Sequence, residues 1–202
     1  EKCLQFTYGH ASYAGQVAVM LFNFKTGQRE WKERETVLED DHILIIEGIH
    51  GLNPKTSADL PEEAKFRIYI NALTHLNLDE HNRIPTSDYR LIRRIARDYQ
   101  FRSWSAQNTI HFWKNVKQGE DHNIYPYQEE ADAIFNSSMV YEMSILKKIV
   151  IPLLDQVHPH EAQYLEANRL KKLLAYFVDG SEEAVPRSSI LAEFIGNSVF
   201  DV

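Results

Sequence analysis

The sequence predicts an α/β fold in which a parallel sheet is flanked by helices, and three observations support this class. Residues 43–49 (ILIIEGI) begin with four consecutive apolar residues, as a strand buried on both faces does. Residues 66–72 (FRIYINA) alternate apolar with more polar side chains, which predicts a second strand with one more polar face that carries Tyr69. Amphipathic helical segments follow these strands, and strands that alternate with helices are typical of α/β proteins.

The region before residue 43 predicts a hairpin. Residues 1–21 have a strand-like end at 17–21 but no helical period, so we leave them unassigned. Residues 22–31 carry aromatic side chains on both sides of a Thr26-Gly27 turn signal, which indicates two paired strands. A charged connection follows, and residues 133–136 are expected to form a third strand after the one at 66–72.

Three helices are well marked. The first begins at Pro85-Thr86-Ser87, the second is capped by Ser105 and ends at Gly119, and the third ends near Gly180. Their expected core-facing residues are Leu91, Ile92, Ile95 and Tyr99; Ile110, Trp113 and Val116; and Leu170, Leu173, Leu174 and Phe177. A further helical run at 139–157 contains a proline at position 152, which predicts a kink or a split there.

Composition narrows the class of protein. The chain has 202 residues and a formal net charge of -7, which argues against a protein that coats nucleic acid through a broadly basic face. Its single cysteine, Cys3, suits a reducing compartment. The sequence has no apolar run of the ~20 residues that span a bilayer and no secretory signal, so we expect a cytoplasmic protein without membrane partners.

Glu47 and Gly48 follow the apolar run at 43–46. In open α/β sheets ligands bind outside the carboxyl ends of the strands, and a carboxylate there can hold Mg²⁺ through a water beside nucleotide phosphates. His50 and Asn53 are expected to lie at the same edge. The alternative interpretation is a turn with a solvated glutamate.

An arginine-rich helix is the second candidate site. Six arginines fall within twenty residues, against two acids there. Arg90, Arg94 and Arg97 are spaced i, i+4 and i+7, so they share one helical face, where like charges repel. Arginine suits bidentate binding of phosphate oxygens, although a solvated helix neutralised by neighbouring acids is the alternative.

The sequence contains two weaker signals. Phe22 and Phe24 project on the same side of a strand and could stack on a base, although core packing explains such aromatics more often. His158, His160 and Glu161 are metal-ligand residue types, but the intervening proline favours the start of a helix over a metal site.

Three segments together resemble a known family. They are ILIIEGIHGLNP, IPTSDYRLIRRIARDYQFR and YPYQEEADAIFNSS, and they are similar to the uridine kinase and phosphoribulokinase group, especially to bacterial uridine kinase-like proteins. The resemblance runs from about Phe22 to the C-terminal EFIGNSVF. It implies a P-loop kinase-like domain at 22–157, a remnant at 1–21 and a helical C-terminal extension at 158–202.

The resemblance also implies roles for individual residues, with ATP and Mg²⁺ as cofactors. Glu47 would assist Mg²⁺ and, with Arg94 and Arg97, serve catalysis. The expected substrate-binding residues are Phe22, Phe24, His50, Asn53 and Arg90, and those on the ATP and lid side are Arg93 and Arg102.

The sequence departs from the family pattern in several places. Gly27 stands where a base-contacting histidine is usual, and Trp104 replaces a second lid arginine. No Gly-x-x-x-x-Gly-Lys-Ser/Thr motif occurs, and the catalytic aspartate has no counterpart. Either the upstream half of the domain lies outside this chain, so that the sheet is incomplete, or catalysis has been lost; the retained arginines and Glu47 favour the first explanation.

The resulting functional hypothesis is an ATP-dependent nucleoside kinase that transfers the γ-phosphoryl group to a 5′-hydroxyl, with uridine as the expected substrate. This chain alone, without a phosphate-binding loop, is expected to be inactive. The alternatives are a phosphoribulokinase-like sugar-phosphate kinase and a non-catalytic module that binds phosphate or RNA. A homo-oligomer is compatible with the sequence, which does not fix the oligomeric state.

Overall fold

The computed structural model describes residues 4–8, 17–23, 28–32, 43–58 and 60–200. The chain divides into two compact units. The first comprises Glu1–Tyr69 and Gly119–Ala133, and the second comprises Ile70–Gln118 and Ile134–Val202.

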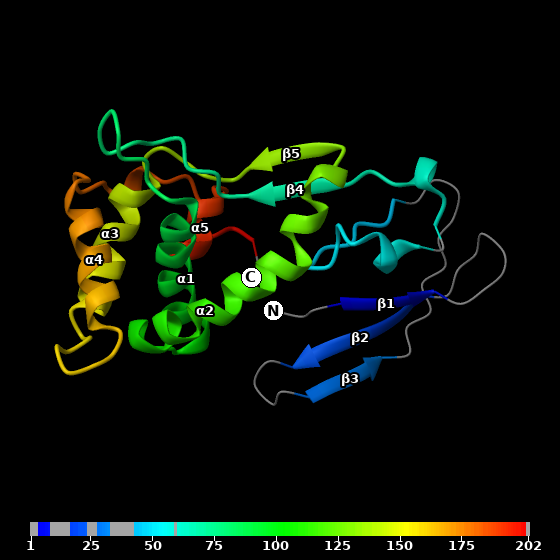
Figure 1. Ribbon diagram of the computed structural model, residues 1–202, viewed down its shortest axis with the longest axis horizontal. Coiled ribbons are helices and arrows are strands. Elements are labelled where there is room, and N and C mark those ends of the chain that lie inside the picture. The colour runs from blue at the N-terminus through cyan, green and yellow to red at the C-terminus, as the bar shows by residue number, and fades with distance from the viewer. Residues whose placement is uncertain (1–3, 9–16, 24–27, 33–42, 59, 201–202) are drawn as a thin grey trace. The chain divides into compact units, whose positions relative to one another are not determined.

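The first unit contains a three-stranded antiparallel sheet with the order β1-β2-β3 (Figure 1). Its strands are β1 (Leu4–Tyr8), β2 (Val17–Asn23) and β3 (Gln28–Lys32). The pairing of Phe22 with Arg29 confirms the expected hairpin, and β2 confirms the strand expected at 17–21. The turn at Thr26-Gly27 lies outside the described residues.

The strand expected at residues 43–49 is wrong. These residues form no strand, and Ile43 and Ile45 are 89% and 83% exposed. An apolar run becomes a buried parallel strand only where neighbouring strands take up its backbone hydrogen bonds, and no described strand pairs with this segment. The run ends in a turn in which the Gly51 amide donates to the Gly48 carbonyl over 2.9 Å, and Gly48 has a φ of 152°, which favours glycine. The short 3-10 helices η1 (Pro54–Ser57) and η2 (Glu62–Ala64) follow.

A two-stranded parallel sheet joins β4 (Ile68–Asn71) to β5 (Ala133–Asn136), which confirms the strands expected at 66–72 and 133–136. The Ala133 amide donates to the Arg67 carbonyl over 3.2 Å and the Ser137 amide to the Asn71 carbonyl over 2.8 Å, so the pairing advances in the same direction along both strands. With its flanking helices, this sheet confirms the α/β class.

The faces of β4 are not covered as the alternation suggested. Tyr69, expected on the more polar face, is buried, whereas Ile68 and Ile70 are 49% and 63% exposed. Alternation shows that the two faces of a strand differ, but it does not fix which face other elements cover.

The second unit is built mainly from helices around one hydrophobic core. They are α1 (Thr86–Arg102), most of α2 (Ala106–Asn123), α3 (Glu142–Leu154), α4 (Tyr164–Ala175) and α5 (Ile190–Ile195). α1 packs against α3 and α5, and α3 packs against α4 (Figure 1). The fully buried core side chains include Leu91, Ile92, Ile95, Leu146, Leu154, Leu170, Leu174 and Leu191. In the described part of the chain, no helix is both long and apolar enough to cross a bilayer.

Most of the expected helical features are confirmed. The Asn108 amide donates to the Ser105 hydroxyl over 3.2 Å, which is the expected cap, and α1 begins at the expected position. Tyr99 is wrong as a core residue, because it is 53% exposed on the last turn of α1. Gly119 does not end α2, since one glycine inside a helix costs only about 1 kcal/mol.

The end of the chain is helical, with two boundaries that differ from expectation. α3 continues through Pro152, which lies near its C-terminal end, so the helix is not split there. α4 ends at Ala175, before the expected Gly180. The short 3-10 helices η3 (Tyr125–Glu130) and η4 (Glu182–Ala184) complete the described elements.

Candidate anion-binding site

Five arginines of α1 line one cavity of about 250 Å³ in the second unit. They are Arg90, Arg93, Arg94, Arg97 and Arg102. Trp113 of α2, Phe194 of α5, Ser137 and the end of β4 also line it. We call this cavity the arginine pocket. The i, i+4, i+7 spacing explains why Arg90, Arg94 and Arg97 lie on the same side of α1.

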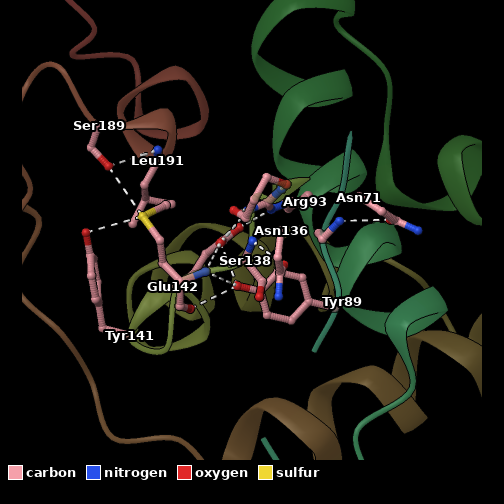
Figure 2. A network of polar contacts seen from close by, with 12 residues as sticks. Asn71, Tyr89, Arg93, Asn136, Ser138, Tyr141, Glu142, Ser189 and Leu191 are labelled. Atoms are coloured by element: carbon pink, nitrogen blue, oxygen red, sulfur yellow. Dashed lines mark hydrogen bonds and ion pairs between the residues drawn. The ribbon is translucent and has the colours of Figure 1, made fainter. Parts of the chain in front are cut away.

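A buried ion pair fixes Arg93 at the wall of the arginine pocket (Figure 2). The Glu142 side chain at the start of α3 is fully buried, and both of its oxygens accept hydrogen bonds from the Arg93 guanidinium. The guanidinium also donates to the Ser137 hydroxyl over 3.0 Å and to the Ser137 carbonyl over 2.6 Å. The Tyr89 hydroxyl donates to Glu142 over 2.6 Å. These contacts hold the Arg93 guanidinium in a fixed position, and its expected role on the ATP and lid side stays a prediction.

Burial and neighbouring charges shift the pKa values of two side chains in this network. Burial and the adjacent Glu142 carboxylate raise the pKa of Tyr89. Burial alone would lower the pKa of Arg93, but its hydrogen bonds and ion pair with Glu142 more than compensate, so that the pKa is raised. Both side chains therefore keep their protons throughout the physiological pH range.

Asp98 holds two further arginines of the pocket. Its side chain is fully buried, and its carboxylate accepts hydrogen bonds from Arg94 at 3.1 Å, Arg102 at 2.9 Å and the Thr109 hydroxyl at 3.1 Å. Arg94 and Arg102 each lie one helical turn from Asp98, an i, i+4 arrangement that favours such pairs. The acid thus relieves the repulsion that the arginine spacing implies.

Arg97 pairs with a residue of the C-terminal region. Its guanidinium lies 3.2 Å from the Glu193 carboxylate on α5, and both side chains are partly exposed. Within the described part of the chain, the pocket arginines Arg93, Arg94, Arg97 and Arg102 thus pair with the carboxylates of Asp98, Glu142 and Glu193. A pocket lined by guanidinium groups suits a small anion, because arginines can bind phosphate oxygens in a bidentate manner.

The remaining candidate residues belong to the first unit. Phe22 lies in β2, and Phe24 falls outside the described residues. Glu47 and His50 are exposed around the turn at Gly48. The Asn53 side chain caps η1 by accepting from the Lys55 amide over 3.0 Å. The five candidate arginines thus share one pocket, whereas Glu47, His50 and Asn53 lie in a separate unit.

The residues around the pocket fit the phosphate groups of a nucleotide better than a metal ion held by protein ligands alone. Guanidinium groups complement phosphate charge, and no cluster of three or more His, Cys, Asp or Glu residues within the described ranges could hold a metal. Mg²⁺ usually binds through one or two carboxylates, several waters and substrate phosphates, so Glu47 is the sequence-predicted carboxylate for that role. His158 and His160 stack 5.8 Å apart before α4, as a segment that leads into a helix.

Sequence reasoning did not find every residue of the site. Glu142 and Glu193 are distant from the arginines in the sequence, and no local spacing links them to α1. Trp113 was expected in the core and does lie at its edge, but it also lines the pocket. The six arginines at 83–102 outnumber the two acids there, and this excess was the available signal that carboxylates distant in the sequence could pair with them.

The fold and the site define an α/β protein with an arginine-lined pocket. Residues 8–144 match the Phosphoribulokinase / Uridine kinase family, and the chain belongs to this family. The family consists of ATP-dependent kinases, which are phosphotransferases that use ATP and Mg²⁺. Neither the curated proteins nor the solved structures gave a match.

Proposed function

We propose that this protein serves as an ATP-dependent nucleoside kinase, with uridine as the expected substrate. The reaction would move the γ-phosphoryl group of ATP to the 5′-hydroxyl of the nucleoside, giving ADP and a nucleoside 5′-monophosphate, with release of the hydroxyl proton. Family membership supports the reaction class, and the convergence of five arginines on one pocket is the observation that carries the proposal.

The arginines would act by positioning and by charge neutralisation. Phosphoryl transfer requires little covalent chemistry from the protein, because the transition state spreads negative charge over the transferred oxygens. Arg94 and Arg97 are each 32–33% exposed, so their guanidinium groups can reach a phosphate while Asp98 and Glu193 hold them in place. Preorganised charges of this kind stabilise developing charge without reorganisation during the reaction.

The test is an activity assay on the full-length gene product with ATP and Mg²⁺ across a panel of nucleosides, with ADP release as the readout. Arg97→Met should lower kcat/KM roughly 10- to 100-fold, because a hydrogen bond to a charged group contributes about 1.5–3 kcal/mol. Arg83→Met is the matched control, since Arg83 is an exposed arginine that does not line the pocket. The proposal fails if no nucleoside is phosphorylated.

A sugar-phosphate kinase is the second candidate. The pocket volume of about 250 Å³ lies below the range of roughly 300–1,000 Å³ that drug-sized ligands occupy, and its lining is strongly cationic. Both properties favour a small acceptor that already carries a phosphate. Ribulose 5-phosphate therefore belongs in the acceptor panel, and its selective phosphorylation would replace the nucleoside proposal.

A further inference from the structure

The C-terminal helix α5 contributes one residue to the lining of the arginine pocket and one ion-pair partner to an arginine that lines it. Phe194 lines the pocket, and its ring lies 5.3 Å from the Arg93 guanidinium carbon. Glu193 pairs with Arg97 over 3.2 Å. α5 lies beyond residues 8–144, which match the family, so this wall of the pocket comes from a part of the chain that the match does not cover.

α5 is fixed against α1 by more than this ion pair. Leu191 and Ala192 are fully buried, and the two helices pack against each other. The Ser189 hydroxyl caps α5 by accepting from the Leu191 amide over 3.2 Å. Gly196 ends the helix with a φ of 79°, a left-handed conformation that favours glycine. The Glu193 carboxylate is therefore held at Arg97 by the packing of its own helix.

The three carboxylates beside the pocket are not equivalent. Asp98 and Glu142 are fully buried, so an incoming anion cannot replace them without leaving a buried charge. Glu193 is 24% exposed and faces an arginine that is 33% exposed. It is thus the carboxylate that a solvent-borne anion can most readily displace from its guanidinium.

We propose that Glu193 sets the anion affinity of the arginine pocket by competing with the ligand's phosphate group for Arg97. The ligand class is a phosphate monoester or a polyphosphate, which must displace the carboxylate or bind beside it. This inference rests on the proposed function, in which the pocket binds phosphate groups. It predicts that neutralising Glu193 tightens binding, whereas a purely structural role would weaken binding or leave it unchanged.

The test measures pyrophosphate binding to the full chain by isothermal titration calorimetry at fixed ionic strength. Glu193→Gln keeps the side-chain shape and should lower the Kd about threefold to tenfold, as expected for removing one partly screened charge beside an anion. Glu183→Gln removes the same charge from an exposed residue that does not line the pocket, and its Kd should stay within about twofold of the parent. Thermal melting of each variant checks that the fold is retained.

Two further variants assign the effect to the ion pair. Glu193→Asp retains the negative charge and should bind less tightly than Glu193→Gln. Adding Arg97→Met to Glu193→Gln should abolish the gain, because the proposed competition acts through Arg97.

The outcomes separate the two proposals. If the parent chain binds pyrophosphate and Glu193→Gln binds no more tightly, the competition is refuted while the pocket stands as an anion site. If only Glu193→Gln binds, the competition is supported. If neither protein binds at millimolar concentrations, both the competition and the pocket's phosphate-binding role are overturned.

Discussion

The buried ion pair between Arg93 and Glu142 gives the sharpest stability prediction. Glu142→Gln keeps the side-chain shape but removes the negative charge from a site with no solvent exposure. Breaking a buried pair by removing one partner costs about 3–5 kcal/mol, because the remaining charge loses its compensation. Arg93 keeps two acceptors on Ser137 and 11% side-chain exposure, so we expect the lower end of that range, about 3 kcal/mol.

Urea denaturation followed by circular dichroism measures this loss of unfolding free energy. The melting temperature should fall by about 6–12 °C, since 1 kcal/mol corresponds to about 2–4 °C for a protein of this size. Asp179→Asn is the control, because it removes the partner of Lys147 at a site where the acid is 63% exposed, and it should cost less than about 1 kcal/mol.

A double variant tests whether an uncompensated buried charge causes the loss of stability in Glu142→Gln. When Arg93→Met is combined with Glu142→Leu, both charges are gone, and Tyr89 can still donate to the Met139 carbonyl over 3.0 Å. The double variant should therefore lose less unfolding free energy than Glu142→Gln alone, because replacing a whole buried ion pair by apolar groups is often nearly neutral. A cost below about 1 kcal/mol for Glu142→Gln would refute the reasoning that Glu142 compensates a buried charge.

Two other predictions concern carboxylates of α1 and α4. Asp98→Asn should destabilise the protein by about 2–4 kcal/mol in urea denaturation, because two arginines lose their buried counter-charge; unchanged stability would show that solvent already compensates them. Arg169, which lies 2.6 Å from Asp88 and 2.6 Å from Glu166, lowers the pKa of Glu166 through its hydrogen bonds. A lowered acid pKa stabilises the fold above the ordinary value of 4.5 and loses that effect as the pH falls through the folded-state pKa, so the stability deficit of Arg169→Met should be larger at pH 7 than at pH 3. A deficit in thermal melting that does not change with pH would contradict this assignment.

The elements that sequence reasoning located correctly are those with local causes. α1 follows from its apolar stripe and its proline-led start, and α2 from the Ser105 cap. Residues 43–46 show the limit of local reasoning, because an apolar run is equally compatible with a central strand and with an exposed segment until its pairing partners are known. Strand existence depends on distant residues, whereas a helix satisfies most of its backbone hydrogen bonds within itself.

In the candidate site, too, the features with local causes could be predicted and those that depend on distant residues could not. Helical spacing predicted that Arg90, Arg94 and Arg97 share a face, and they do line one pocket. The carboxylates that hold Arg93 and Arg97 come from α3 and α5, and helical period contains no information about such tertiary partners. Counting charges along α1 therefore underestimated how many guanidinium groups have a carboxylate partner.

The ion pairs of the pocket arginines affect how strongly the protein attracts an anion from a distance. Arg93 and Arg97 each lie beside one carboxylate, and Arg94 and Arg102 share Asp98, so at a distance most of the positive charge of these four side chains is cancelled. With a chain charge of -7, long-range electrostatic steering toward the pocket is weak. A ligand would therefore associate by ordinary diffusion and interact with the guanidinium groups only at contact range. Differences in affinity between ligands would then arise mainly from their dissociation rates.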